Sequence, residues 1–109
     1  MGKGKTVSTM QERIKKDVES HPVILFMKGS KLMPLCGFSG QVVEVLNGFG
    51  IDFETRNVLD DDELRQGIKT YSNWPTLPQL YIEGEFIGGC DIVMQLHEQG
   101  ALEKLLKRS

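Results

Sequence analysis

The stretch VILFMKGSKLMPLCGFS, residues 23–39, contains the features that decide the fold. It opens with five consecutive apolar residues, 23–27, a run of strand length. An uninterrupted apolar run is typical of a strand buried on both faces, as in the centre of an α/β sheet. Residues 28–35 contain glycine, serine and proline and are expected to form a loop, after which a helix begins near Cys36.

The rest of the chain supplies further strands and helices around this centre. The first predicted helix begins at a Thr9–Glu12 capping box and ends at His21-Pro22, before the strand 23–27. A second helix, from about Cys36 to Gly48, is followed by a strand over 51–58 and by a third helix that begins in the acidic run 60–63. We then predict strands at 79–82 and 86–87 and helices over 92–99 and 101–107. Asp91 is expected to cap the helix over 92–99.

This order of elements predicts an α/β fold. The strand–helix–strand start requires a right-handed crossover and parallel pairing, whereas the later hairpin must be antiparallel. We therefore expect a small mixed sheet with helices on both faces, in a single domain over residues 9–107. Residues 1–8 are expected to form a flexible lead.

Composition excludes several functional classes. The 109 residues carry a formal net charge of −2, which argues against a dedicated nucleic-acid binder. No apolar run approaches the ~20 residues that span a bilayer. Two cysteines are too few for a disulfide-rich secreted scaffold. We therefore expect a soluble protein of a reducing compartment, with no nucleic-acid or membrane partner.

Cys36 is the strongest candidate for chemistry. Free backbone N–H groups and the positive end of the helix dipole converge at a helix start, and both stabilise a thiolate there. Lys28, at the end of the preceding strand, adds an opposite charge. A thiolate is both a nucleophile and a metal ligand. The alternative is a small buried side chain, a frequent fate of free cysteine, although Pro34 and Gly37 favour an exposed turn.

The motif around this thiol is Cys36-Gly37-Phe38-Ser39, not C-x-x-C. Because the fourth position is serine, a mixed disulfide on Cys36 must be resolved by an external thiol, or by Cys90 if the fold brings it near. The thiolate can instead remain reduced and bind metal. One cysteine cannot fill a four-thiolate iron–sulfur site, so other ligands must come from another subunit or from small thiols.

From about Thr9 to Leu106 the sequence resembles the monothiol glutaredoxins of the Cys-Gly-Phe-Ser class. The resemblance is carried by Phe26-Met27-Lys28-Gly29, Cys36-Gly37-Phe38-Ser39, Trp74-Pro75-Thr76-Leu77-Pro78 and Gly88-Gly89-Cys90-Asp91, in the family's order and at compatible spacing. It implies a thioredoxin-like fold, with a small four-stranded mixed sheet flanked by helices.

The resemblance also implies a glutathione site. Lys28 would approach both the Cys36 sulfur and the glycine carboxylate of glutathione. Arg65 and Lys69 would hold that same carboxylate, for which a guanidinium is suited by bidentate pairing. The alternative is that Lys28 and Arg65 are ordinary solvated cations.

The remainder of the implied site comes from the second half of the chain. Leu77, before a predicted cis Pro78, would offer its backbone N–H and C=O to the cysteinyl part of glutathione. Cys90 and Asp91 would bind the γ-glutamyl end, through backbone N–H groups and through the Asp91 carboxylate. The predicted binding set also includes Phe38.

Three of these positions have plainer interpretations. Asp91 can act as a helix cap alone. Cys90 can be core filler rather than a redox partner of Cys36. Trp74, within the third motif, can simply pack against the edge of the sheet.

Two functions from different classes follow from the resemblance. In the first, two copies share one [2Fe–2S] cluster, with Cys36 and one glutathione thiolate from each, and deliver it to recipient proteins; the chain is then a homodimer with cluster and a monomer without it. In the second, Cys36 is the nucleophile of a glutathione-dependent oxidoreductase. A thiol-binding adaptor with neither activity is a third possibility.

We favour the carrier, with at most weak glutathione-dependent disulfide reductase activity. The compartment implied by the resemblance is the cytoplasm in a bacterium, and the plastid stroma or mitochondrial matrix in a eukaryote.

Overall fold

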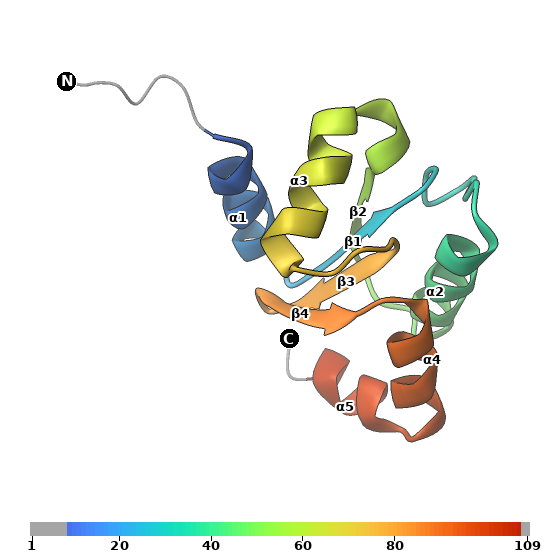
Figure 1. Ribbon diagram of the computed structural model, residues 1–109. Helices are drawn as coiled ribbons and strands as arrows, with labels where there is room; N and C mark the ends of the chain where they lie inside the picture. The colour runs from blue at the N-terminus through green and yellow to red at the C-terminus, as the bar shows by residue number, and fades with distance from the viewer. Residues whose placement is uncertain (1–8, 108–109) are drawn as a thin grey trace.

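The computed structural model describes residues 9–107 as a four-stranded sheet with helices on both of its faces (Figure 1). The strands are β1 (Val23–Met27), β2 (Glu54–Asn57), β3 (Gln79–Ile82) and β4 (Glu85–Gly88). The helices are α1 (Met10–Ser20), α2 (Gly37–Gly48), α3 (Asp62–Ser72), α4 (Cys90–Glu98) and α5 (Ala101–Lys107), and a 3₁₀-helix, η2 (Val58–Asp60), lies between β2 and α3. The predicted lead, residues 1–8, lies outside the described residues. In the described part of the chain, no helix is both long and apolar enough to cross a membrane.

The sheet has the strand order β2-β1-β3-β4. β1 runs parallel to β2 and antiparallel to β3, and β4 is antiparallel to β3. All five residues of β1 are buried, because this inner strand has a neighbour at each edge and helices above and below it. The predicted four-stranded mixed sheet is therefore confirmed, and the central position of β1 explains its continuous apolar run.

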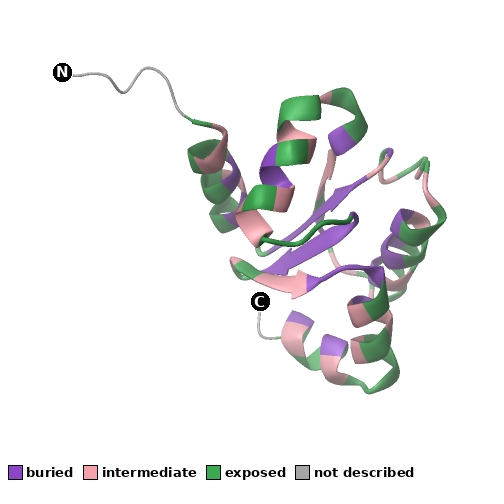
Figure 2. Cartoon of the chain, viewed as in Figure 1, coloured by how far each residue is buried: buried purple, intermediate pink, exposed green. Residues whose placement is uncertain are grey.

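Two hydrophobic cores lie on opposite faces of the sheet (Figure 2). Successive side chains of a strand point to opposite faces, so β1 contributes to both cores. One core joins Val23, Leu25 and Met27 to Val42, Val43 and Leu46 of α2, Val93 of α4, and Leu102 and Leu106 of α5. The other core joins Ile24 and Phe26 to Ile14 and Val18 of α1 and Ile68 of α3.

The predicted N-terminal ends of helices α1 and α3 are confirmed. The Thr9 hydroxyl accepts a hydrogen bond from the Glu12 N–H at 3.1 Å, and the Glu12 carboxylate accepts one from the Thr9 N–H at 2.9 Å. Asp61 caps α3 by accepting from the Leu64 N–H at 3.1 Å. Each bond satisfies a backbone donor that the helix itself leaves unpaired.

The predicted strand over 51–58 is too long. Only Glu54–Asn57 pair with β1, whose last residue, Met27, lies opposite Asn57. Beyond that point there is no partner strand, and Val58 instead begins the 3₁₀-helix η2. The Asn57 side chain stabilises this turn by accepting a hydrogen bond from the Leu59 N–H at 3.0 Å.

The prediction that Asp91 caps a helix beginning at Ile92 is wrong. The cap is Gly89, and Cys90 and Asp91 already lie in the first turn of α4. The corner between β4 and α4 is tight: a Cβ on Gly88 would lie 2.6 Å from Cβ of Ile92. Gly88 allows this close approach because it has no side chain, and the helix starts two residues earlier than expected.

Candidate functional site

Cys36 lies at the N-terminus of α2, where β1 and its loop lead into the helix. Its backbone is extended, with φ −143° and ψ 133°, so it is the N-cap rather than the first helical residue that the sequence suggested. Its carbonyl accepts the first helical hydrogen bond, from the Gly40 N–H at 2.9 Å. The half-buried thiol therefore lies beside the free N–H groups of the first turn.

Residues 28–35 form a compact hairpin-like turn before this thiol. Ser30 and Met33 exchange two backbone hydrogen bonds, each of 3.1 Å. The Leu35 N–H donates to the Lys28 carbonyl at 2.9 Å, which closes the turn at its base. These bonds bring Lys28, at the end of β1, next to the thiol.

Ser39, in the first turn of α2, connects the end of β1 to this helix through a buried hydrogen bond. Its side chain is fully buried, and its hydroxyl accepts a hydrogen bond from the Lys28 N–H at 3.1 Å. The serine that replaces the second cysteine of a dithiol motif therefore fixes the end of β1 against the first turn of the helix.

These surroundings lower the pKa of the Cys36 thiol below its ordinary value. The backbone N–H of Ser39 has the largest effect, and partial burial of the thiol opposes it. The Phe38 N–H, the Ser39 hydroxyl and the positive charge of Lys28 lower the pKa further. The direction agrees with the prediction from the helix N-terminus, and it favours the nucleophilic thiolate.

A groove of about 340 Å³ lies between the start of α2, the segment before β3 and the start of α4. Its lining consists of Phe38, Trp74, Thr76, Leu77, Gly89, Cys90, Asp91 and Ile92. Four predicted binding residues, Phe38, Leu77, Cys90 and Asp91, thus meet in one place although they are far apart in the sequence. Phe38 is exposed here, although it lies on α2. The Leu77–Pro78 peptide bond is cis, as predicted.

Cys90 has a defined partner in this groove. The residue is buried, and its thiol donates a hydrogen bond to the Gln41 side-chain carbonyl at 3.1 Å. Burial is the main cause that raises the pKa of Cys90, and the negative charges of Asp91 and Cys36 act in the same direction. Both cysteines are free, and Cys90 is held in the protonated form that Cys36 tends to lose.

The two predicted cations of α3, Arg65 and Lys69, do not line the groove. Lys69 lines an adjoining hollow, which shares Trp74 with the groove. Arg65 is half-buried, and its Nε is buried without a hydrogen-bond partner among the described residues. Leaving a buried donor without a hydrogen-bond partner costs stability.

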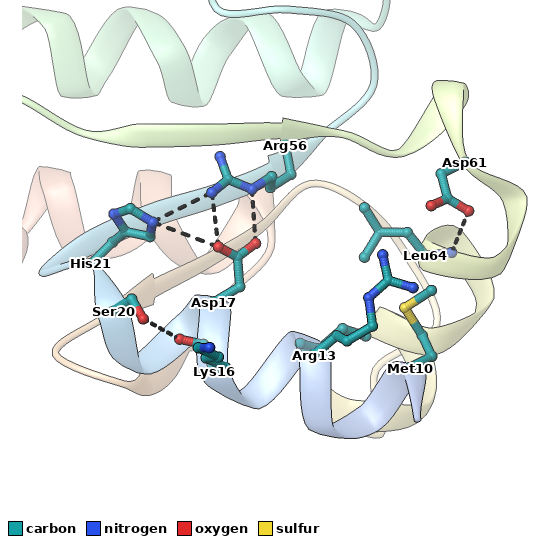
Figure 3. Close-up of a pocket in the computed structure, with 10 residues that line it drawn as sticks. Met10, Arg13, Lys16, Asp17, Ser20, His21, Arg56, Asp61 and Leu64 are labelled. Atoms are coloured by element: carbon teal, nitrogen blue, oxygen red, sulfur yellow. Dashed lines mark hydrogen bonds and ion pairs between the residues drawn. The ribbon is translucent and has the colours of Figure 1, made fainter. Parts of the chain in front are cut away.

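A larger hollow, of about 460 Å³, lies between α1, β2 and α3 and contains different chemistry (Figure 3). Arg56 donates to both carboxylate oxygens of Asp17 at 2.8 Å, and His21 lies beside them. Arg56 and Asp17 bind one another, and the lining of this hollow includes neither cysteine. The groove beside Cys36 is therefore the candidate functional site.

Comparison with known proteins places the chain in a family. Residues 23–87 match the family model described as Glutaredoxin. The chain belongs to the glutaredoxin family. Within that family it is similar to a Synechocystis protein named "Uncharacterized monothiol glutaredoxin ycf64-like", with 57% identity over 87% of this chain and 89% of that protein. The Cys36-Gly37-Phe38-Ser39 motif and this relative identify it as a monothiol glutaredoxin.

Solved structures agree with this assignment and with the thioredoxin-like fold. The solution structure of reduced poplar apo GrxS14 has a TM-score of 0.81 and 48% identity, covering 92% of each chain. The crystal structure of a buckwheat glutaredoxin–glutathione complex has a TM-score of 0.81 and 25% identity, covering 91% of this chain and 88% of that one.

Sequence reasoning missed some of the residues that line the groove of this glutaredoxin, and one residue, Gln41, that contacts a lining residue. For Trp74 the sequence indicates no role in binding, only that it can pack against the sheet edge; it does contact Phe86, at 5.8 Å between ring centroids, but it also lines the groove. Thr76 and Ile92 carried no signal of their own. Gln41 was missed because its partner, Cys90, is 49 positions away. Position within the recognised motifs was the one signal that pointed to Trp74 and Thr76.

Proposed function

We propose that this monothiol glutaredoxin binds glutathione in the groove beside Cys36 and, together with a second copy, carries a [2Fe–2S] cluster as cargo for recipient proteins. The observation that carries the proposal is a half-exposed thiol of lowered pKa with no second cysteine in its motif, next to a groove lined by Phe38, Leu77, Cys90 and Asp91. The domain with this function is proposed to span residues 9–107.

The groove suits the γ-glutamyl end of glutathione. At the start of α4 the N-cap is Gly89, which has no side chain to satisfy the free N–H groups of the first turn. Those N–H groups favour a carboxylate, and the exposed Asp91 carboxylate complements an ammonium. Leu77 is buried at the same groove, so its contribution to glutathione binding is assigned to its main chain.

The other end of the tripeptide carries the glycine carboxylate. Lys28 lies close enough to Cys36 for its charge to lower the pKa of the thiol, and Lys69 lies in the hollow next to the groove. The resemblance adds the guanidinium of Arg65, which lies on the same helix as Lys69. We assign these three cations to that end because a guanidinium and two ammonium groups match a single carboxylate well.

Ligand counting supports the shared cluster. A [2Fe–2S] cluster takes four thiolates in its common form, and the chain has two cysteines, of which Cys90 is buried and bonded to Gln41. Two copies of Cys36 and two glutathione thiolates supply the count. Apolar side chains that a second copy could cover flank the thiol: Leu32 is 95% exposed, and Leu35 and Phe38 are also exposed.

Anaerobic reconstitution with iron, sulfide and glutathione tests the carrier. We expect a visible-absorbing cluster and a dimer on gel filtration, both lost when glutathione is omitted and in Cys36→Ser. Cys90→Ser is the matched variant and should retain the cluster, because only the backbone of Cys90 is assigned to glutathione. Loss of the cluster in Cys90→Ser but not in Cys36→Ser would contradict the ligand assignment.

Thiol–disulfide exchange is the second candidate, and the lowered pKa of Cys36 favours it. The Cys36 thiolate would attack the glutathione sulfur of a glutathionylated protein, forming a Cys36–glutathione disulfide and releasing the protein thiolate. A second glutathione thiolate would then attack that disulfide, giving glutathione disulfide and restoring Cys36. Rapid turnover of a glutathionylated substrate with no cluster on reconstitution would select this function. Absence of both would leave a thiol-binding adaptor.

The compartment is proposed on chemical grounds. Two free thiols, one of them ionising readily, persist where the surroundings are reducing. This condition is met in the bacterial cytoplasm, the plastid stroma and the mitochondrial matrix.

A further inference from the structure

Gln79, the first residue of β3, is a fully buried polar side chain that lies directly behind the groove. Its side-chain amide nitrogen donates to two backbone carbonyls, those of Trp74 and Thr76, each at 3.2 Å. Its side-chain carbonyl accepts a hydrogen bond from the Tyr81 hydroxyl at 3.0 Å. Both amide hydrogens are thus used, and the amide orientation is fixed by its three partners.

The Tyr81 hydroxyl is a dependable donor in this network. Burial raises the pKa of Tyr81 far above its ordinary value, so the hydroxyl stays protonated at any physiological pH. Tyr81 is itself fixed by aromatic contacts with Phe26, at 5.6 Å, and Phe86, at 5.4 Å between ring centroids. Through Tyr81, the hydrogen bonds of Gln79 are therefore connected to the hydrophobic core between the sheet and helices α1 and α3.

The two carbonyls that Gln79 binds belong to the segment 74–77, which forms one wall of the groove. That wall also meets α4 closely: a Cβ on Gly89 would lie 3.3 Å from Trp74 Nε1 and 3.3 Å from the Pro78 carbonyl oxygen. The start of α4 therefore approaches this segment closely because Gly89 has no side chain, and Gln79 binds the segment through its carbonyls.

An apolar residue would fill the space behind this segment without the cost of burying an amide. A buried glutamine at this position instead sets the orientation of two carbonyls in the wall. We propose that Gln79 is the positioning residue of the groove: by binding the Trp74 and Thr76 carbonyls it holds the main chain at Leu77 in the geometry that receives the glutathione main chain. This inference rests on the proposed glutathione site.

The test uses the full chain with three variants. Gln79→Met keeps the length of the side chain but removes all three hydrogen bonds. Tyr81→Phe keeps Gln79 and removes only the hydroxyl that orients its amide. Val18→Ala, in the core beside α1, is the control for lost stability, because α1 does not line the groove.

Two readouts separate positioning from general stability. Affinity for reduced glutathione is measured by NMR titration, and access to the segment is measured by acrylamide quenching of Trp74, the single tryptophan of the chain. We expect Gln79→Met to weaken binding by about tenfold and to increase quenching, Tyr81→Phe to act in the same direction but less, and Val18→Ala to change neither.

The proposal is overturned if Gln79→Met binds glutathione and is quenched as the wild type is, or if Val18→Ala changes both readouts equally. If Gln79→Met does not fold, Tyr81→Phe decides, and an unchanged affinity and quenching in that variant overturn the proposal. If the wild-type chain does not bind glutathione, the proposed function fails instead, while increased quenching in Gln79→Met would still support the role of Gln79 in holding segment 74–77.

Discussion

At the scale of single residues, Ser39 stands where a dithiol motif would carry its second cysteine, and its buried hydroxyl serves two neighbours. It accepts a hydrogen bond from the Lys28 N–H at 3.1 Å, and it contributes to the lowered pKa of Cys36. A hydroxyl can do both at once, because it has lone pairs for the N–H and a hydrogen for the sulfur. The serine of the motif is therefore part of the electrostatics of the thiol.

We expect Ser39→Ala to raise the pKa of Cys36 toward the ordinary thiol value. The main-chain N–H groups remain, so the thiolate is weakened and not abolished. Thiolate absorbance near 240 nm against pH, in a Cys90→Ser background, measures the change. Ser30→Ala is the matched control, because this loop hydroxyl accepts from the Met33 N–H, at 3.0 Å, and is not among the groups that shift the pKa of Cys36. An unchanged titration in Ser39→Ala would mean that the hydroxyl does not reach the sulfur.

Ionisation of Cys36 should also make stability depend on pH. Because the folded pKa lies below the unfolded one, the thiolate contribution to stability is complete above the ordinary thiol pKa of about 8.5 and is lost as pH falls through the lowered folded value. The free energy of unfolding of the wild type, relative to Cys36→Ser, should therefore increase from acid to alkaline pH. Urea unfolding across this window measures it, and a constant difference would contradict the prediction.

Lys31 connects the turn formed by residues 28–35 to Phe53, the residue before β2. Its Nζ donates to the Phe53 carbonyl at 2.6 Å and lies 4.0 Å from the centroid of the Phe53 ring. We expect Lys31→Met to destabilise the fold by about 0.5–2 kcal/mol, from the loss of a charged hydrogen bond and a cation–π contact. Urea unfolding compares it with Lys15→Met on the exposed side of α1. Equal stability of the two variants would show that the contact between Lys31 and Phe53 does not stabilise the fold.

At the scale of elements, the packing of α1 against α3 depends on Gly67. A Cβ at this position would lie 2.6 Å from Cγ of Met10 and 3.1 Å from Cδ1 of Ile14. The Gln11 side chain also donates to the Gly67 carbonyl, at 2.9 Å. The two helices therefore approach each other closely because this residue has no side chain.

Gly67→Ala should destabilise the protein by about 1–3 kcal/mol, the usual cost of forcing an extra carbon into a well-packed core. Gly48→Ala is the matched control, because a Cβ there meets nothing within 4 Å. Thermal unfolding of both variants gives the comparison. If Gly67→Ala is as stable as Gly48→Ala, the helices can separate without cost and the packing argument fails.

At the scale of the whole molecule, the Asp17–Arg56 pair joins α1 to the edge strand β2 (Figure 3). Asp17 raises the pKa of Arg56, first through the hydrogen bonds between their side chains. Both side chains are nevertheless partly exposed, and solvent screening limits the value of such a pair. Arg56 also keeps a second carboxylate, that of Glu54, at 3.3 Å.

Asp17→Asn should therefore cost less than about 1 kcal/mol at low salt, and less still in 1 M NaCl, where charges are screened. Urea unfolding at both salt concentrations measures this difference. Glu103→Gln, which removes an exposed ion pair with Lys107 on α5, is the control and should cost even less. If Asp17→Asn lowered the free energy of unfolding by several kcal/mol, the Asp17–Arg56 pair would be a main source of the stability of the contact between α1 and the sheet.

Local features were predictable where neighbouring residues alone determine them. The capping box at Thr9 and the apolar run of β1 involve contacts within a few positions or a plain demand for burial. Two other features were predicted only in part. The length of β2 depends on where β1 ends, and the start of α4 depends on how closely Gly88 can approach Ile92.

The amino-acid sequence alone was enough to predict the helices and strands, the mixed sheet and the ionisable thiol at the start of a helix. These features depend on periodicity, capping and helix N-termini, which act over one or two turns of the chain. Only the tertiary structure decided which distant groups meet: Gln41 with Cys90, Gln79 behind segment 74–77, and Arg56 with Asp17. Such pairs depend on how the sheet and helices pack in three dimensions, and no spacing along the chain encodes them.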